Sequence, residues 1–181
     1  LVPTMAPELF VLPDSAQDYD WDPLTSVLDD LAIDEGYDLD DYAFIVYVTP
    51  HTTAKGRAHI AGRSQRIFGH ANASIHAHEF GHNYGLGHAN SWIEASGAGF
   101  LGHLSGDTRV EHSEYGDIFD TMGSDRYSWP DGSITFSNGH YSMHGKAYLN
   151  WIESGEVTNI TVSGQYRIYR FDHPNARSGS H

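Results

Sequence analysis

Three histidines at fixed spacing lie in residues 78–88, whose sequence is HEFGHNYGLGH. Side chains four residues apart lie on one face of an α-helix, so His78 and His82 can share one metal ion. Gly85 can adopt the left-handed conformation that ends a helix, which lets His88 return as a third nitrogen ligand. Three imidazoles with one open position are typical of a catalytic zinc site. The segment therefore predicts a helix that ends in a sharp turn beside a metal.

Glu79 directly follows the first of these histidines. Its carboxylate can reach a water on the shared metal without being a ligand, which is the position of a general base. The chain has 13 His and no Cys, which excludes thiolate ligands, disulfides and cysteine nucleophiles. Neutral imidazoles suit Zn²⁺. We therefore expect one catalytic zinc ion at His78, His82 and His88, with Glu79 as the base.

Hydrophobic periodicity outlines the remaining elements. Apolar positions at helical spacing predict a helix over residues 23–35, and the histidine motif lies on a second helix over 72–84. The continuous apolar run 42–49 predicts a buried central strand. Further expectations are strands at 57–62 and 65–68, an irregular loop region at 89–119, a helix at 140–152, and a terminal hairpin of strands 157–162 and 165–171. This mixture indicates an α+β fold.

Charge is distributed unevenly along the chain. The formal net charge is −14, and residues 1–54 contain 12 of the 24 acidic residues but no Lys or Arg. This argues against nucleic acid or an anionic membrane as a partner, and no apolar run is long enough to span a bilayer. We interpret the acidic stretch as a solvated face. A calcium loop on Asp18, Asp20, Asp22 and Asp29 is an alternative, but Pro23 occupies the position that needs Gly.

With these residues in hand, segment 78–88 resembles the HExxHxxGxxH signature of the metzincin clan of zinc endopeptidases. Residues 120–123 (DTMG) look like the Met-turn that metzincins carry below the metal, with Met122 as its methionine. Within the clan, the chain is most similar to the gametolysin-like peptidases. This similarity lies in the runs 46–50, 81–89, 114–117 and 149–151.

The resemblance implies an α/β-like upper subdomain up to about residue 88, with a twisted mixed sheet and the active-site helix. A smaller lower subdomain with the Met-turn and a C-terminal helix would complete a catalytic domain over residues 1–152. Residues 153–175 would form a terminal β-hairpin that begins a β-rich extension, and residues 176–181 look like a tag remnant.

The resemblance also implies an edge strand that pairs with bound peptide. The residues nominated for that strand are Arg57, Ala58, His59, Ile60 and Ala61. Ser124 stands where some metzincins have an additional Tyr ligand, and neither Tyr115 nor Tyr127 is assigned to that role.

Three acidic residues precede Met122 closely. Glu114, Asp117 and Asp120 are either ligands of a calcium ion or hydrogen-bonding anchors of the loop. The sequence leaves both interpretations open, and we favour the loop anchor.

Together these features predict a secreted, monomeric zinc endopeptidase that cleaves extracellular, matrix or cell-wall proteins. No signal peptide opens the chain, so we expect a signal or pro-segment to have been removed. Zinc would polarise the scissile carbonyl, while Glu79 takes a proton from the attacking water and returns it to the leaving amine. The alternatives are a non-catalytic, zinc-bound binding module and a zinc amidase that acts on a non-peptide cell-wall amide.

Overall fold

A computed structural model of the chain describes residues 4–6, 9–14, 21–50, 55–69, 73–94, 110–124, 126–128, 134–136 and 140–167. The chain divides into two compact units, Leu1–His140 and Tyr141–His181. The mixture of helices and strands, with a small mixed sheet, agrees with the predicted α+β class. Within the described part of the chain, no helix has the length and apolar character needed to cross a membrane.

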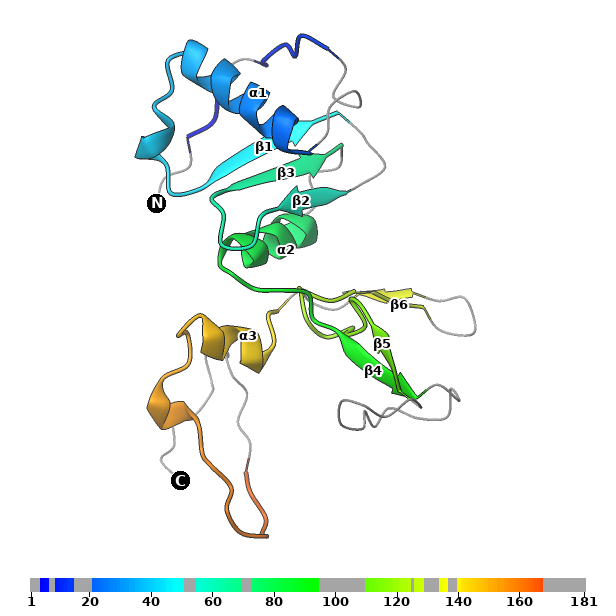
Figure 1. The fold of residues 1–181 in the computed structure, drawn as a ribbon. Coiled ribbons are helices and arrows are strands. Elements are labelled where there is room, and N and C mark those ends of the chain that lie inside the picture. The colour runs from blue at the N-terminus through cyan, green and yellow to red at the C-terminus, as the bar shows by residue number, and fades with distance from the viewer. Residues whose placement is uncertain are drawn as a thin grey trace. The chain divides into compact units, whose positions relative to one another are not determined.

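The first unit contains a three-stranded sheet (Figure 1). Its strands are β1 (Ile45–Thr49), β2 (Gly56–Ala58) and β3 (Ser64–Phe68), in the order β1-β3-β2. β1 runs parallel to β3, and β2 runs antiparallel to it. The helix α1 (Trp21–Asp34) lies on one side of the sheet and α2 (Ala73–Asn83) on the other (Figure 1). Both helices confirm the predictions for residues 23–35 and 72–84.

The contact between α1 and the sheet is apolar and includes a polar link. Leu24 and Leu28 of α1 pack against Tyr47 of β1 in a buried cluster. The Tyr47 hydroxyl donates a hydrogen bond to Asp29 on the same helix. The amphipathic spacing that predicts α1 therefore also identifies the face that it buries.

The prediction of a buried central strand at residues 42–49 is wrong. β1 lies at the edge of the described sheet, and Val46 and Val48 are 38% and 61% exposed. β3 takes the central position, although its sequence SQRIF is partly polar. A continuous apolar run indicates burial but does not show how many partners a strand has, because those partners come from distant parts of the chain.

The end of α2 follows the expected glycine turn. Gly85 has a φ of 99°, and the amides of Gly85 and Leu86 donate to the carbonyls of His82 and Gly81. Phe80 at the end of α2 packs edge-on against Phe44, with ring centroids 5.5 Å apart. The chain thus leaves the helix in a sharp turn that precedes His88.

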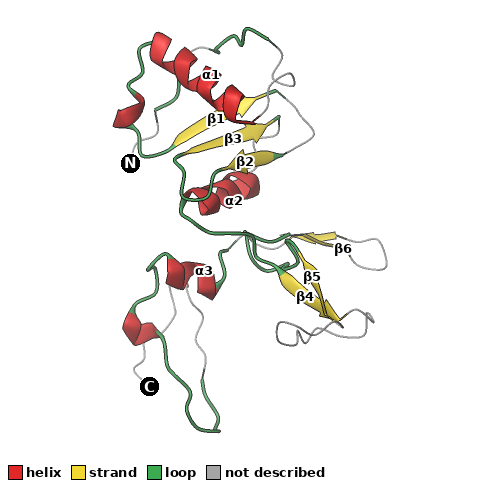
Figure 2. Cartoon of the chain, in the orientation of Figure 1, coloured by secondary structure: helices red, strands yellow, loops and turns green. Residues whose placement is uncertain are grey.

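Beyond the helix, residues 89–119 were expected to be irregular, and this is wrong in part. β4 (Ser91–Glu94) and β5 (Val110–Ser113) form an antiparallel pair separate from the main sheet (Figure 2). β6 (Arg126–Ser128) and β7 (Ile134–Phe136) form a second antiparallel pair. Gly, Ser and charged residues do not prevent pairing when a partner strand is available.

The second unit contains α3 (Met143–Tyr148), which is shorter than the helix predicted at 140–152. The Ser142 side chain caps it by accepting a hydrogen bond from the Gly145 amide. A 3-10 helix follows at Ser154–Glu156, and residues 157–162 form no strand. The predicted hairpin is therefore wrong at its first strand. Residues 165–167 of the second strand also form no strand, and residues 168–181 lie outside the described part of the chain.

Candidate metal centre

Three imidazoles meet at the end of α2. His78 and His82 lie one turn apart on the helix, and His88 returns after the Gly85 turn. One ring nitrogen of each histidine lies within 4.8 Å of the corresponding atoms of the other two. Among the described residues, this is the one group of three or more potential ligand side chains that could hold a metal ion.

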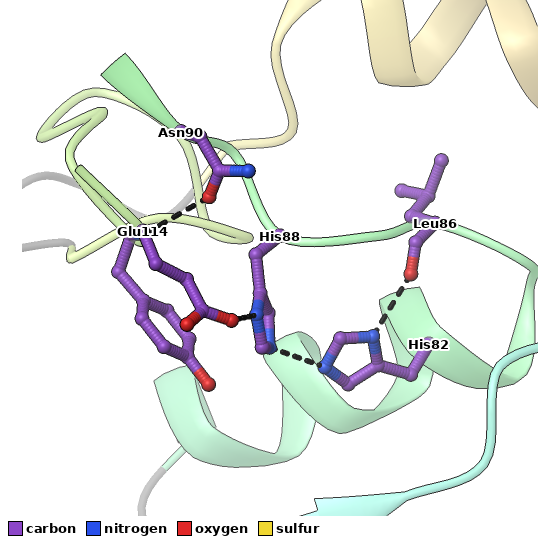
Figure 3. A network of polar contacts seen from close by, with 6 residues as sticks. His82, Leu86, His88, Asn90 and Glu114 are labelled. Carbon is purple, nitrogen blue, oxygen red and sulfur yellow. Dashed lines mark hydrogen bonds and ion pairs between the residues drawn. The ribbon is translucent and has the colours of Figure 1, made fainter. Parts of the chain in front are cut away.

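Each imidazole is oriented by a hydrogen bond at Nδ1. The acceptors are the Thr121 carbonyl oxygen for His78, the Leu86 carbonyl oxygen for His82 and the Glu114 carboxylate for His88, at 2.8, 2.8 and 2.7 Å. Figure 3 shows the last two. Because these oxygens only accept, each Nδ1 carries the hydrogen, which leaves Nε2 as the free ligand atom in a neutral ring.

The distance between two of these free atoms suits a shared cation. Nε2 of His82 and Nε2 of His88 are 3.1 Å apart (Figure 3). Two lone pairs at this distance repel each other unless a proton or metal ion lies between them. Tetrahedral zinc, with Zn–N bonds of about 2.0–2.1 Å, sets its nitrogen ligands about 3.3–3.4 Å apart. The donor set therefore fits a metal ion.

The environment of His82 favours the neutral, metal-binding form. Burial lowers the pKa of His82, and charge on His78 or His88 lowers it further, against an opposing hydrogen bond to the Leu86 carbonyl. A metal ligand must be unprotonated at the binding nitrogen. The site is thus ready for a cation without first losing a proton from His82.

Glu79 is 5% exposed and lies against β2. A Cβ atom at Gly56 would stand 2.6 Å from Glu79 Oε1, so only glycine leaves room for this carboxylate. Burial raises the pKa of Glu79 to about 7, and Oε2 is buried without a hydrogen-bond partner in the described residues. A buried carboxylate oxygen of this kind has the capacity to accept a proton or a hydrogen bond from a bound molecule.

The turn that contains Met122 contributes directly to the site. Met122 is 2% exposed, its amide donates to Asp120 Oδ1, and the preceding carbonyl, of Thr121, holds His78. The Gly123 amide closes the turn by donating to the Asp120 carbonyl. A Cβ at Gly123 would lie 1.9 Å from the Asp117 carbonyl oxygen, so the turn requires glycine.

Glu114, Asp117 and Asp120 form no common metal-binding group in the structure. Asp117 Oδ1 accepts a hydrogen bond from the Phe119 amide, and Asp120 does the same for Met122. Glu114 contacts His88 instead. This geometry favours loop anchoring over a calcium site. For the other calcium alternative, Asp18 and Asp20 lie outside the described residues.

The nominated peptide-binding strand is shorter than expected. β2 lies at the edge of the described sheet and contains Arg57 and Ala58. His59, Ile60 and Ala61 belong to the following turn, in which Ala61 has a φ of 58° and donates to the His82 carbonyl. The strand prediction is wrong for these three residues because the chain turns there to pack against the end of α2.

Tyr115 is the site residue whose place the sequence does not reveal. Its ring centroid lies 3.8 Å from that of His88 and 5.8 Å from that of His78. Burial raises the pKa of Tyr115, and the charges of Glu114 and Glu79 raise it further. The available signal was its position beside Glu114, in a run that already resembled the gametolysin-like peptidases, but sequence spacing does not place it on the metal centre.

These residues define a three-histidine candidate metal centre with a buried carboxylate beside it. No protein-family model, curated protein or solved structure matches the chain. The residues of the site itself are therefore what indicates a function for this chain.

Proposed function

We propose that the protein is a zinc-dependent endopeptidase of the metzincin type. The observation that carries this proposal is the convergence of His78, His82 and His88, with Nδ1 occupied on each, beside the buried carboxylate of Glu79. The turn around Met122, adjacent to His78, adds support.

The donor set supports zinc as the metal. It consists of three neutral nitrogen ligands, and the chain contains no Cys. Three protein ligands with an open position are typical of catalytic rather than structural zinc. Zinc bound here would polarise a peptide carbonyl and acidify a water molecule.

The protein's own groups then have separate tasks. Glu79 accepts a proton from the attacking water and donates it to the leaving amine, and its burial keeps bulk water from competing for that proton. The hydrogen bonds at Nδ1 keep the three imidazoles in position through both steps. The edge of β2 pairs with an extended peptide, so that main-chain hydrogen bonds supply affinity. We further propose that the protein acts outside the cell on protein or peptide substrates.

Digestion of casein and of a peptide library by the full chain, with and without zinc, tests this function. We expect cleavage with zinc, loss of cleavage with o-phenanthroline, and recovery when zinc is added back. Serine and thiol reagents should have no effect, because no side chain serves as the nucleophile. A protein that binds zinc tightly but cleaves no peptide would instead be a binding module or would act on another amide. Full cleavage in a zinc-free sample would overturn the proposal.

A further inference from the structure

His88 is held in a different way from the other two histidines. His78 and His82 lie on α2, and their Nδ1 atoms donate to main-chain carbonyls. His88 lies in an irregular segment after the Gly85 turn, so no helix restricts its ring. Its orientation therefore depends on side chains from another part of the chain.

Glu114 holds one edge of the His88 ring. The carboxylate Oε1 accepts a hydrogen bond from His88 Nδ1 at 2.7 Å (Figure 3). A hydrogen bond to a carboxylate is shorter and stronger than one to a neutral acceptor, and it increases the basicity of the opposite nitrogen. The Glu114 side chain is 61% exposed, so this contact is not a by-product of core packing.

Tyr115 covers the face of the same ring. The two ring centroids are 3.8 Å apart, with an angle of 36° between the ring planes. The Tyr115 backbone has a φ of 59°, which is uncommon for a non-glycine residue and is often found where surrounding contacts enforce it for function. Its amide donates to Asn90 Oδ1 at 3.1 Å, which fixes this conformation from the segment next to His88.

We propose that Glu114 and Tyr115 form a clamp that positions His88 as a metal ligand, with Glu114 fixing the edge of the imidazole and Tyr115 fixing its face. Both are positioning residues that act through His88. The inference rests on the proposed function only in that His88 binds the metal. It does not require that the protein cleave peptides.

The two halves of the clamp predict different substitution patterns. Glu114→Ala removes both the acceptor and the charge, and loss of such a partner typically weakens metal binding about 10–100-fold. Glu114→Gln keeps an acceptor without the charge, so its zinc affinity should fall between those of Glu114→Ala and the wild type. Tyr115→Phe keeps the ring and should bind zinc as the wild type does, whereas Tyr115→Ala should weaken binding.

The experiment measures the zinc Kd of each full-length variant by competition with a chelating dye. The visible absorption spectrum of the cobalt-substituted protein provides a second readout, because it reports ligand geometry rather than general stability. Phe119→Ala, at a 79% exposed residue of the same loop, and Glu35→Ala, at an exposed acid elsewhere, are matched controls. Both controls should leave the Kd and the spectrum unchanged.

Wild-type Kd and cobalt spectrum in both Glu114→Ala and Tyr115→Ala would overturn the clamp. Equal losses in Tyr115→Phe and Tyr115→Ala would overturn the assignment of the ring face. Should an alanine variant unfold, the zinc affinities of Glu114→Gln and Tyr115→Phe still test the clamp. A zinc affinity of Glu114→Gln equal to that of the wild type would contradict the role of the Glu114 charge. Clamp variants that lose zinc while the wild type shows no proteolysis would support the clamp and contradict only the proposed endopeptidase.

Discussion

Glu79 follows His78 directly on α2 and does not belong to the three-histidine candidate metal group. Replacing it with Gln preserves shape and hydrogen-bonding capacity but removes the ability to accept a proton. We expect Glu79→Gln to keep its zinc and its fold. Its kcat should fall by a factor of about 10²–10⁴ or more, since general acid–base catalysis usually contributes a factor of this size. Peptide hydrolysis and zinc content, measured on one preparation, check this.

Glu35→Gln is the matched control, because Glu35 is an exposed carboxylate directly after α1. If the proposed peptidase activity exists, a Glu79→Gln variant that retains its zinc and more than about a tenth of that activity would identify another group as the base. Loss of zinc in this variant would instead place Glu79 among the ligands.

Gly56 controls the space that Glu79 occupies. A methyl group there would lie 2.6 Å from Glu79 Oε1 and 2.8 Å from Ile75 Cγ2, so either β2 or the carboxylate must move. We expect Gly56→Ala to lower the free energy of unfolding by about 1–3 kcal/mol, as overpacking usually does. It should also reduce activity while zinc content stays at the wild-type level.

Urea unfolding and peptide hydrolysis measure the two effects. Gly155→Ala is the control, since a Cβ at that position meets no atom within 4 Å. Full activity and stability in Gly56→Ala would show that Glu79 does not depend on this close approach.

Helices were easier to predict than strand positions. The spacing of Leu24 and Leu28 indicates α1 and its buried face, and the glycine turn at Gly85 marks the end of α2. These signals are local, because a helix satisfies its hydrogen bonds within a few residues. The place of β1 in the sheet is not predictable in this way, since it depends on which distant segment pairs beside it.

The dependence of strands on distant partners also explains why β4 and β5 were not predicted and why residues 157–162 form no strand. β4 and β5 pair across 15 intervening residues, so the sequence near either strand does not indicate its partner. At residues 160–162 apolar and polar residues alternate, but the side chains of Val157, Ile160 and Val162 remain largely exposed. Alternation stabilises a strand only where one face is covered.

The link between α1 and β1 provides a prediction for these elements. Tyr47 is buried and donates to Asp29, so Tyr47→Phe leaves a carboxylate without this donor. Hydrogen bonds to charged groups contribute about 1.5–3 kcal/mol, and we expect a loss of this size in the free energy of unfolding. Tyr148→Phe, at an exposed tyrosine of α3, should have no effect.

The same contact has a defined pH dependence. Burial, followed by the hydrogen bond to Asp29, raises the pKa of Tyr47 far above its ordinary value. The contribution is therefore complete below the unfolded pKa of about 10 and declines as pH rises above it. Urea unfolding between neutral pH and about pH 11 should show a steeper loss for the wild type than for Tyr47→Phe. An equal loss of unfolding free energy with pH in the wild type and in Tyr47→Phe would contradict the assignment of this pH dependence to Tyr47.

At the scale of the whole molecule, the site joins segments that are far apart in sequence. His78 depends on Thr121, 43 residues away, and His88 depends on Glu114, 26 residues away. The three-histidine group was predictable because helical spacing and a glycine turn bring its members together locally. The groups that hold the imidazoles, the Thr121 carbonyl and the Glu114 carboxylate, were not predictable. No periodic pattern in the sequence indicates which partner such a group contacts.

Because the metal centre ties these segments together, metal binding should stabilise the fold that contains it. Zinc at 100 times its Kd adds about 2.7 kcal/mol to the native state by mass action. For a chain of this size, each kcal/mol raises Tm by about 2–4 °C, so zinc should raise the Tm of the metal-free protein by about 5–11 °C. Thermal unfolding across a zinc titration measures this shift.

In His82→Ala the shift should vanish, because the buried middle ligand is lost, whereas His144→Ala, at an exposed histidine of α3, should retain it. An equal shift in the wild type and His82→Ala would mean that zinc stabilises the chain from another site, and the three-histidine assignment would fail.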